Sequence, residues 1–95
     1  MNKEQNDEIL RITQEECAEV IQAISKVFRF GIDGMHNGVS NQAHLEEEIG
    51  DLVCMVDLLM ERGLVSVEAV DNAARAKLIK LSKWANIGET NEQLG

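Results

Sequence analysis

An uninterrupted helical pattern of apolar residues runs from about Gln5 to Phe30. The chain contains no proline, and acidic residues precede basic ones along this segment, which suits the helix dipole. A helix of this length is the element against which the rest of so short a chain must pack. Its apolar members recur at spacings of three and four, on one helical face: Ile9, Ile12, Val20, Ile24 and Val27.

Two further helices are predicted downstream. The second spans about Gln42 to Arg62, and the third runs from Val67 to about Asn86. Each begins near a serine that can act as its N-cap. Residues 31–41 contain three glycines and two asparagines and are expected to form a loop. The polar tail from Gly88 to Gly95 is expected to fray.

The fold class predicted from these elements is all-α: a helical bundle of two long antiparallel helices plus a third packed helix. The length of 95 residues allows one domain, residues 1–95, with a limited core. Self-association buries more apolar surface, so a homo-oligomer is expected to complete the bundle. The second helix is expected to bury Leu45, Ile49, Leu52, Val56 and Leu59. The third is expected to bury Val67, Val70, Ala74, Leu78, Leu81 and Ala85.

Charge and composition exclude several partners. A formal net charge of −8 argues against binding of nucleic acid, which requires a basic surface. The sequence holds no membrane-length apolar stretch, and its first residues are polar, so neither a membrane partner nor a signal peptide is expected. Cys17 and Cys54 are isolated thiols within helical patterns. They are interpreted as small buried hydrophobes in a reducing, cytoplasmic compartment.

An acidic cluster in the first helix falls partly on the buried side. Each helical residue advances by about 100°, so with Ile9 at zero Glu16 lies near 340°, within the apolar stripe. By the same period Glu19 lies at about 280°, on the edge of the stripe, and Glu15 at about 240°, just beyond it. A carboxylate therefore occupies a position where an aliphatic residue is expected.

A second acidic cluster shows the same arrangement. Glu48 and Asp51 lie one turn apart on one shoulder of the second helix's apolar stripe, whereas Glu46 and Glu47 lie off it. Ionised carboxylates that are buried without partners are costly, and the bases of these two helices lie elsewhere. A divalent cation is the simplest remedy, and oxygen ligands suit Mg²⁺ or Mn²⁺. The alternative interpretation is a solvated acidic face, the common role of helical glutamates.

Basic side chains gather on the third helix. Lys77 lies on the shoulder of its apolar stripe, where it can reach a phosphate or simply extend to water. A metal site beside a basic helix suits a polyphosphate substrate. His36 and His44, in or beside the loop, are interpreted as polar surface residues.

The acidic motifs resemble those of a known family. Glu15-Glu16-x-x-Glu19 followed by Glu48-x-x-Asp51 is similar to the EExxE…ExxD signature of the MazG-like nucleotide pyrophosphohydrolases, within the all-α NTP pyrophosphatase superfamily. The resemblance extends over most of the chain and looks like the compact, single-domain type. It also includes the segments 18–23, 29–31 and 48–52.

This resemblance implies an enzyme that hydrolyses a nucleoside triphosphate between its α- and β-phosphates, giving the monophosphate and pyrophosphate. It implies a homodimer or homotetramer with sites that use helices from neighbouring subunits. The alternative is a non-catalytic acidic helical oligomerisation module, and a metal-binding but inactive relative is a mixed case. By position, the Mg²⁺ (or Mn²⁺) ligands would be Glu16, Glu19, Glu48 and Asp51. Glu15 and Glu19 would act in catalysis, and the substrate contacts expected are Arg29, Asn41, Lys77 and Lys80.

Overall fold

The computed structural model describes residues 2–87, which form three helices and one short hairpin. The all-α fold class is confirmed, and the helices begin and end within two residues of their predicted bounds. The predicted fraying of the C-terminal tail lies outside the described residues. In chain order the elements are α1 (Lys3–Phe30), β1 (Met35–His36), β2 (Val39–Ser40), α2 (Asn41–Glu61) and α3 (Val67–Trp84).

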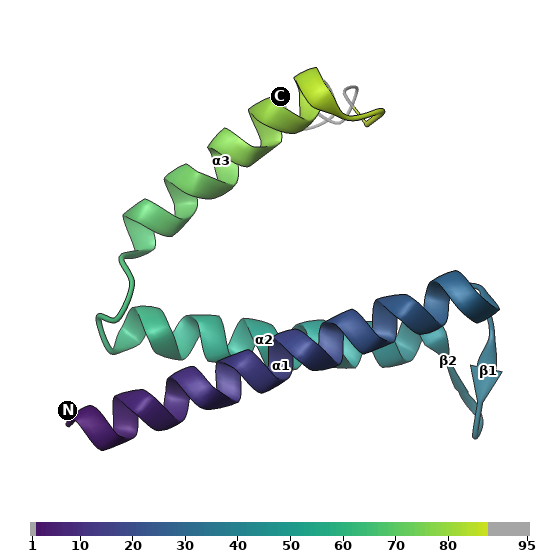
Figure 1. Cartoon of the computed structure of the whole chain (residues 1–95), viewed down its shortest axis with the longest axis horizontal. Helices are drawn as coiled ribbons and strands as arrows, with labels where there is room; N and C mark the ends of the chain where they lie inside the picture. The colour runs from purple at the N-terminus through teal and green to yellow at the C-terminus, as the bar shows by residue number, and fades with distance from the viewer. Residues whose placement is uncertain (1, 88–95) are drawn as a thin grey trace. The chain divides into compact units, whose positions relative to one another are not determined.

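The chain divides into two units, one ending at Leu64 and one beginning at Val65. In the first unit α1 and α2 pack side by side and run antiparallel, with the hairpin at the end where they connect (Figure 1). The predicted antiparallel pair is therefore confirmed. The second unit holds α3, capped by the Ser66 hydroxyl, which accepts a hydrogen bond from the Ala69 backbone N–H at 3.2 Å. The packing of the third helix and the oligomer stay predictions.

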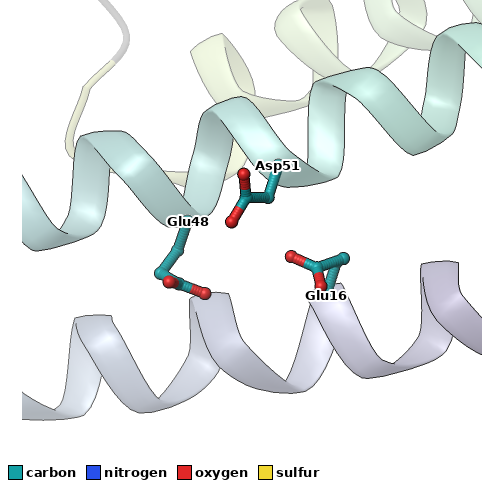
Figure 2. A group of neighbouring side chains, drawn as sticks. All are labelled: Glu16, Glu48 and Asp51. Carbon is teal, nitrogen blue, oxygen red and sulfur yellow. The ribbon is translucent and has the colours of Figure 1, made fainter.

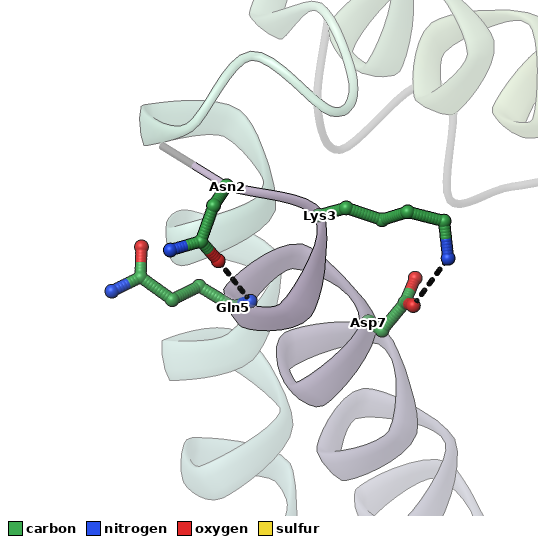
Figure 3. Close-up of polar contacts among 4 residues, drawn as sticks. All are labelled: Asn2, Lys3, Gln5 and Asp7. Carbon is green, nitrogen blue, oxygen red and sulfur yellow. Dashed lines mark hydrogen bonds and ion pairs between the residues drawn. The ribbon is translucent and has the colours of Figure 1, made fainter.

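The start of α1 is fixed by local polar contacts (Figure 3). The Asn2 side chain caps the helix by accepting a hydrogen bond from the Gln5 backbone N–H at 2.8 Å. One turn along, the Lys3 ammonium donates to the Asp7 carboxylate at 2.9 Å. The Arg62 guanidinium donates to the Gln5 side-chain oxygen at 3.1 Å, which joins the start of α1 to the end of α2. Since these contacts are exposed, each contributes little beyond fixing the ends of the helix pair.

The apolar core of the first unit lies near that end. It consists of Ile9, Met55 and Leu59, with two partly buried leucines packed against them. Ala23 is fully buried in the other half of α1, where the two helices approach closely. Buried apolar residues of α1 therefore lie on both sides of Glu16, which is half-buried.

The apolar stripes are less buried than predicted. Within the first unit, Ile12, Ile24 and Ile49 are exposed. Cys17 and Cys54 are both exposed, so their interpretation as buried hydrophobes was wrong. A single pair of helices encloses only a narrow seam, and residues on the flanks of a wide apolar stripe are left outside it.

The segment between α1 and α2 is more ordered than the predicted loop. β1 and β2 pair antiparallel, with Met35 opposite Ser40 and His36 opposite Val39. The two turn residues both have positive φ, 52° at Asn37 and 78° at Gly38, as a type I′ turn requires. The expectation of an unstructured loop is corrected, because an Asn-Gly pair favours this hairpin turn.

Asn41 fastens the hairpin to both helices. Gly31 ends α1 with φ 87°, and its carbonyl accepts a hydrogen bond from the Asn41 side-chain amide at 2.9 Å. The Asn41 backbone N–H also donates to the Gly34 carbonyl at 2.8 Å. A Cβ at Gly34 would lie 2.6 Å from the Phe30 carbonyl oxygen and 2.8 Å from the Asn41 amide nitrogen. Only glycine fits there, and the hairpin is held in one position.

Candidate metal centre

Three carboxylates from two helices converge in the middle of the pair. Figure 2 shows Glu16 reaching from α1 towards Glu48 and Asp51, which descend from α2. One oxygen from each lies within 4.8 Å of the others. The antiparallel packing brings the two acidic motifs opposite each other, as the helical period predicted. We call these residues the three-carboxylate centre.

The centre gathers three acidic side chains. Glu48 is buried and Glu16 is half-buried, while Asp51 is exposed. One oxygen of Glu16, Oε2, is buried and has no hydrogen-bond partner. Among residues 2–87, no ion pair brings a lysine or arginine to these carboxylates. Such a group is stable only if it protonates or binds a cation.

Glu16 is the residue most affected by this arrangement. Its pKa is raised above the ordinary carboxyl value, first by burial and then by the charge of Asp51 and that of Glu48. Glu19 and Glu15 make smaller contributions in the same direction. A raised pKa means that the folded protein holds the Glu16 proton more tightly than the unfolded chain does. A cation bound at the centre would instead favour the ionised form of Glu16 in the folded protein.

The donor set fits a hard divalent cation. All three ligands are carboxylate oxygens, which suit Mg²⁺ or Mn²⁺ rather than a soft metal. One oxygen of each side chain lies within 4.8 Å of the others, so the three carboxylates can share one ion after their side chains move closer together. The buried Oε2 atom of Glu16 has no hydrogen-bond partner and is available to a cation. The residues present therefore fit the metal that the sequence predicts.

His44 is a neighbour of the centre that the sequence interpretation missed. Its Nε2 atom lies 3.7 Å from Oε1 of Glu48, and its ring is half-buried. This distance exceeds a hydrogen bond, and the two side chains form an ion pair only when the ring carries a charge. The i,i+4 spacing of the two residues on α2 was the available signal.

Two predicted site residues stand at the margin of the centre. Glu19 and Glu15 are both exposed and lie outside the group of three converging oxygens. They are near enough to Glu16 to raise its pKa. The assignment of Glu19 as a fourth metal ligand, and of Glu15 and Glu19 to catalysis, stays a prediction.

The predicted substrate contacts belong to three helices, α1, α2 and α3. The Arg29 guanidinium lies 5.0 Å from the Phe30 ring centroid, a cation–π contact on the exposed surface. The Asn41 amide nitrogen is occupied by the Gly31 carbonyl, so this side chain first serves the fold. Lys77 and Lys80 are exposed residues of α3, and their role in binding phosphate stays a prediction.

Two antiparallel helices with converging carboxylates define a class of all-α protein suited to divalent cations. The family model of the MazG nucleotide pyrophosphohydrolase domain matches residues 4–85. The chain therefore belongs to the MazG nucleotide pyrophosphohydrolase family, and the resemblance noted in the sequence is confirmed. No curated protein and no solved structure matches the chain. Within residues 2–87, no helix has both the length and the hydropathy needed to cross a bilayer.

Proposed function

We propose that the protein is a Mg²⁺-dependent nucleoside triphosphate pyrophosphohydrolase. It would cleave an NTP or dNTP between the α- and β-phosphates, releasing the monophosphate and pyrophosphate. The observation that carries the proposal is the convergence of Glu16, Glu48 and Asp51, one of which has a buried oxygen without a hydrogen-bond partner. Membership of the MazG family supports the same reaction.

Different acidic residues of the chain would bind the metal and act in catalysis. Glu16, Glu48 and Asp51 would hold Mg²⁺, or Mn²⁺ in its place, with Glu19 as a fourth ligand. When bound, the ion supplies positive charge for phosphate oxygens and lowers the pKa of a coordinated water. Glu15 or Glu19, exposed beside the centre, would orient the attacking water and accept its proton.

Other parts of the proposal rest on the family resemblance. Arg29, Lys77 and Lys80 would contact phosphate oxygens. The enzyme would act as a cytoplasmic homodimer or homotetramer, in one domain, and remove surplus or non-standard nucleotides.

The competing function is a non-catalytic helical oligomerisation module. It is favoured by large apolar side chains on the surface of α1, where Ile21 is 67% exposed and Phe28 is 85% exposed. Such side chains suit an interface between chains. An oligomeric enzyme would show the same exposure, so the two functions are separated by activity and not by assembly.

A nucleotide panel tests the proposal. Wild type is incubated with standard and modified NTPs and dNTPs in Mg²⁺ or Mn²⁺, and monophosphate and pyrophosphate are both quantified. We expect both products in equal amounts, with none after chelation of the metal. Glu16→Gln should lose this activity while keeping its helical circular dichroism, and Glu46→Gln, an exposed neighbour of the motif, should keep it. If no nucleotide is hydrolysed in either metal, the proposal fails.

A further inference from the structure

Two cavities that share lining residues open beside the hairpin. Their volumes are about 300 and 240 Å³, and both are lined by Lys26, His36 and Asn41. We call them together the hairpin cavity. Its walls come from α1, the hairpin and the start of α2, which Asn41 fastens together through Gly31 and Gly34. The cavity is therefore a built feature of the fold.

The lining combines apolar walls with one charge of each sign. Phe30, Met35 and Val39 supply apolar surface. Lys26, which is half-buried, and Glu47 both line the smaller cavity. Within residues 2–87 neither of the two takes part in an ion pair. A cation and a carboxylate thus face the same space without neutralising each other by direct contact.

The hairpin cavity lies within a nucleotide's reach of the three-carboxylate centre. His44 lines the cavity and also lies 3.7 Å from Glu48. It precedes Glu48 by about one helical turn, roughly 6 Å along α2. Lys26 follows Glu16 by ten residues, roughly 15 Å along α1. A nucleotide with its phosphates at the centre can therefore place its other end in the cavity.

The lining fits a base better than a phosphate. Ligand sites for drug-sized molecules usually begin near 300 Å³, and the two cavities have volumes of about 300 and 240 Å³, so each suits a base or nucleoside and not a whole triphosphate. Glu47 would repel a phosphate. Apolar side chains suit the faces of an aromatic ring, while Lys26 and Glu47 suit its polar edge.

We propose that the hairpin cavity binds the nucleobase and that Lys26 and Glu47 select bases with a carbonyl beside a ring N–H. This inference rests on the proposed function and names its substrate class. Lysine only donates hydrogen bonds, and an ionised carboxylate only accepts them. Guanine, hypoxanthine, uracil and thymine offer the matching acceptor and donor. Adenine and cytosine offer the reverse order, an amino donor beside a ring acceptor.

The test measures binding without turnover. Guanosine and adenosine 5′-(α,β-methylene)triphosphates, which resist cleavage at the α–β bond, are titrated calorimetrically into the full chain with Mg²⁺. We expect the guanosine analogue to bind at least about tenfold more tightly. Lys26→Met and Glu47→Ala should each bring the two affinities close together. Glu46→Ala, which changes the adjacent exposed carboxylate, should keep the preference.

The outcomes separate this inference from the proposed function. Equal affinities, a preference for adenosine, or a preference unchanged in both variants would overturn the inference and leave the pyrophosphohydrolase standing. Equal weakening of both analogues by Lys26→Met would also overturn it, because Lys26 would then bind phosphate. Binding of neither analogue, together with no hydrolysis in the nucleotide panel, would remove both proposals.

Discussion

The three-carboxylate centre and the hairpin cavity occupy the same helix pair but are built in different ways. The centre uses only acids on two helices, and no lysine or arginine among residues 2–87 forms an ion pair with any of these three carboxylates. The cavity uses three elements, and it offers apolar walls and charges of both signs. The two proposals accordingly divide the nucleotide between these regions: cation and phosphates would lie at the centre, and the base would lie in the cavity.

The largest expected effect separates the two regions by activity. Asp51→Asn should lower kcat/KM for every nucleotide by more than about 100-fold, since even outer-shell changes at metal sites cost 10–100-fold. Its ratio of GTP to ATP turnover should stay that of wild type. Lys26→Met should instead change this ratio by about tenfold. Steady-state pyrophosphate release measures both, and a change of ratio in Asp51→Asn would show that the regions are not separate.

A smaller effect, on stability, is expected from a substitution that disturbs only the hairpin end of the helix pair. Gly34→Ala places a methyl group against the Phe30 carbonyl and the Asn41 amide, and overpacking of this kind costs about 1–3 kcal/mol. Gly50→Ala, inside α2 with open space around it, is the control and should stabilise by about 0.5–1 kcal/mol. Urea denaturation of the two variants measures the difference. Equal effects would mean that the hairpin is not fastened as described.

The smallest effect concerns the metal-free centre. The pKa of Glu16 is raised in the folded state, so that state binds more protons than the unfolded chain, and stability increases as pH falls through the raised pKa. Without divalent cations, Glu16→Gln should therefore melt higher than wild type at neutral pH. The advantage should vanish below the ordinary carboxyl pKa, where both states are protonated. Thermal melts across this pH range test the sign, and an advantage that persists in acid would contradict it.

The sequence predicted one region much better than the other. Helical period alone placed Glu16 on the core side of α1 and set Glu48 and Asp51 on one shoulder of α2, because side-chain direction in a helix follows from spacing. Once these positions were predicted, antiparallel packing of α1 against α2 was enough to bring the three carboxylates together. Their role as metal ligands stays a prediction.

The hairpin cavity was not predicted because it depends on turn geometry. Asn37 and Gly38 carried a hairpin signal, but the segment was interpreted as a loop, so the paired strands that position Met35 and Val39 were not predicted. Asn41 was expected to contact substrate, and its hydrogen bond to Gly31 is set by the end of α1. Hydrogen bonds of this kind join residues of different elements, so helical periodicity does not predict them.

The central claim is that the three carboxylates hold one divalent cation, and titration with Mn²⁺ followed by electron paramagnetic resonance tests it directly. Wild type should bind Mn²⁺ and release it to excess Mg²⁺. Glu16→Gln should bind it at least about tenfold more weakly, because it replaces a charged oxygen donor with a neutral one. Glu46→Gln should match wild type. Equal Mn²⁺ affinity in all three proteins would contradict the claim.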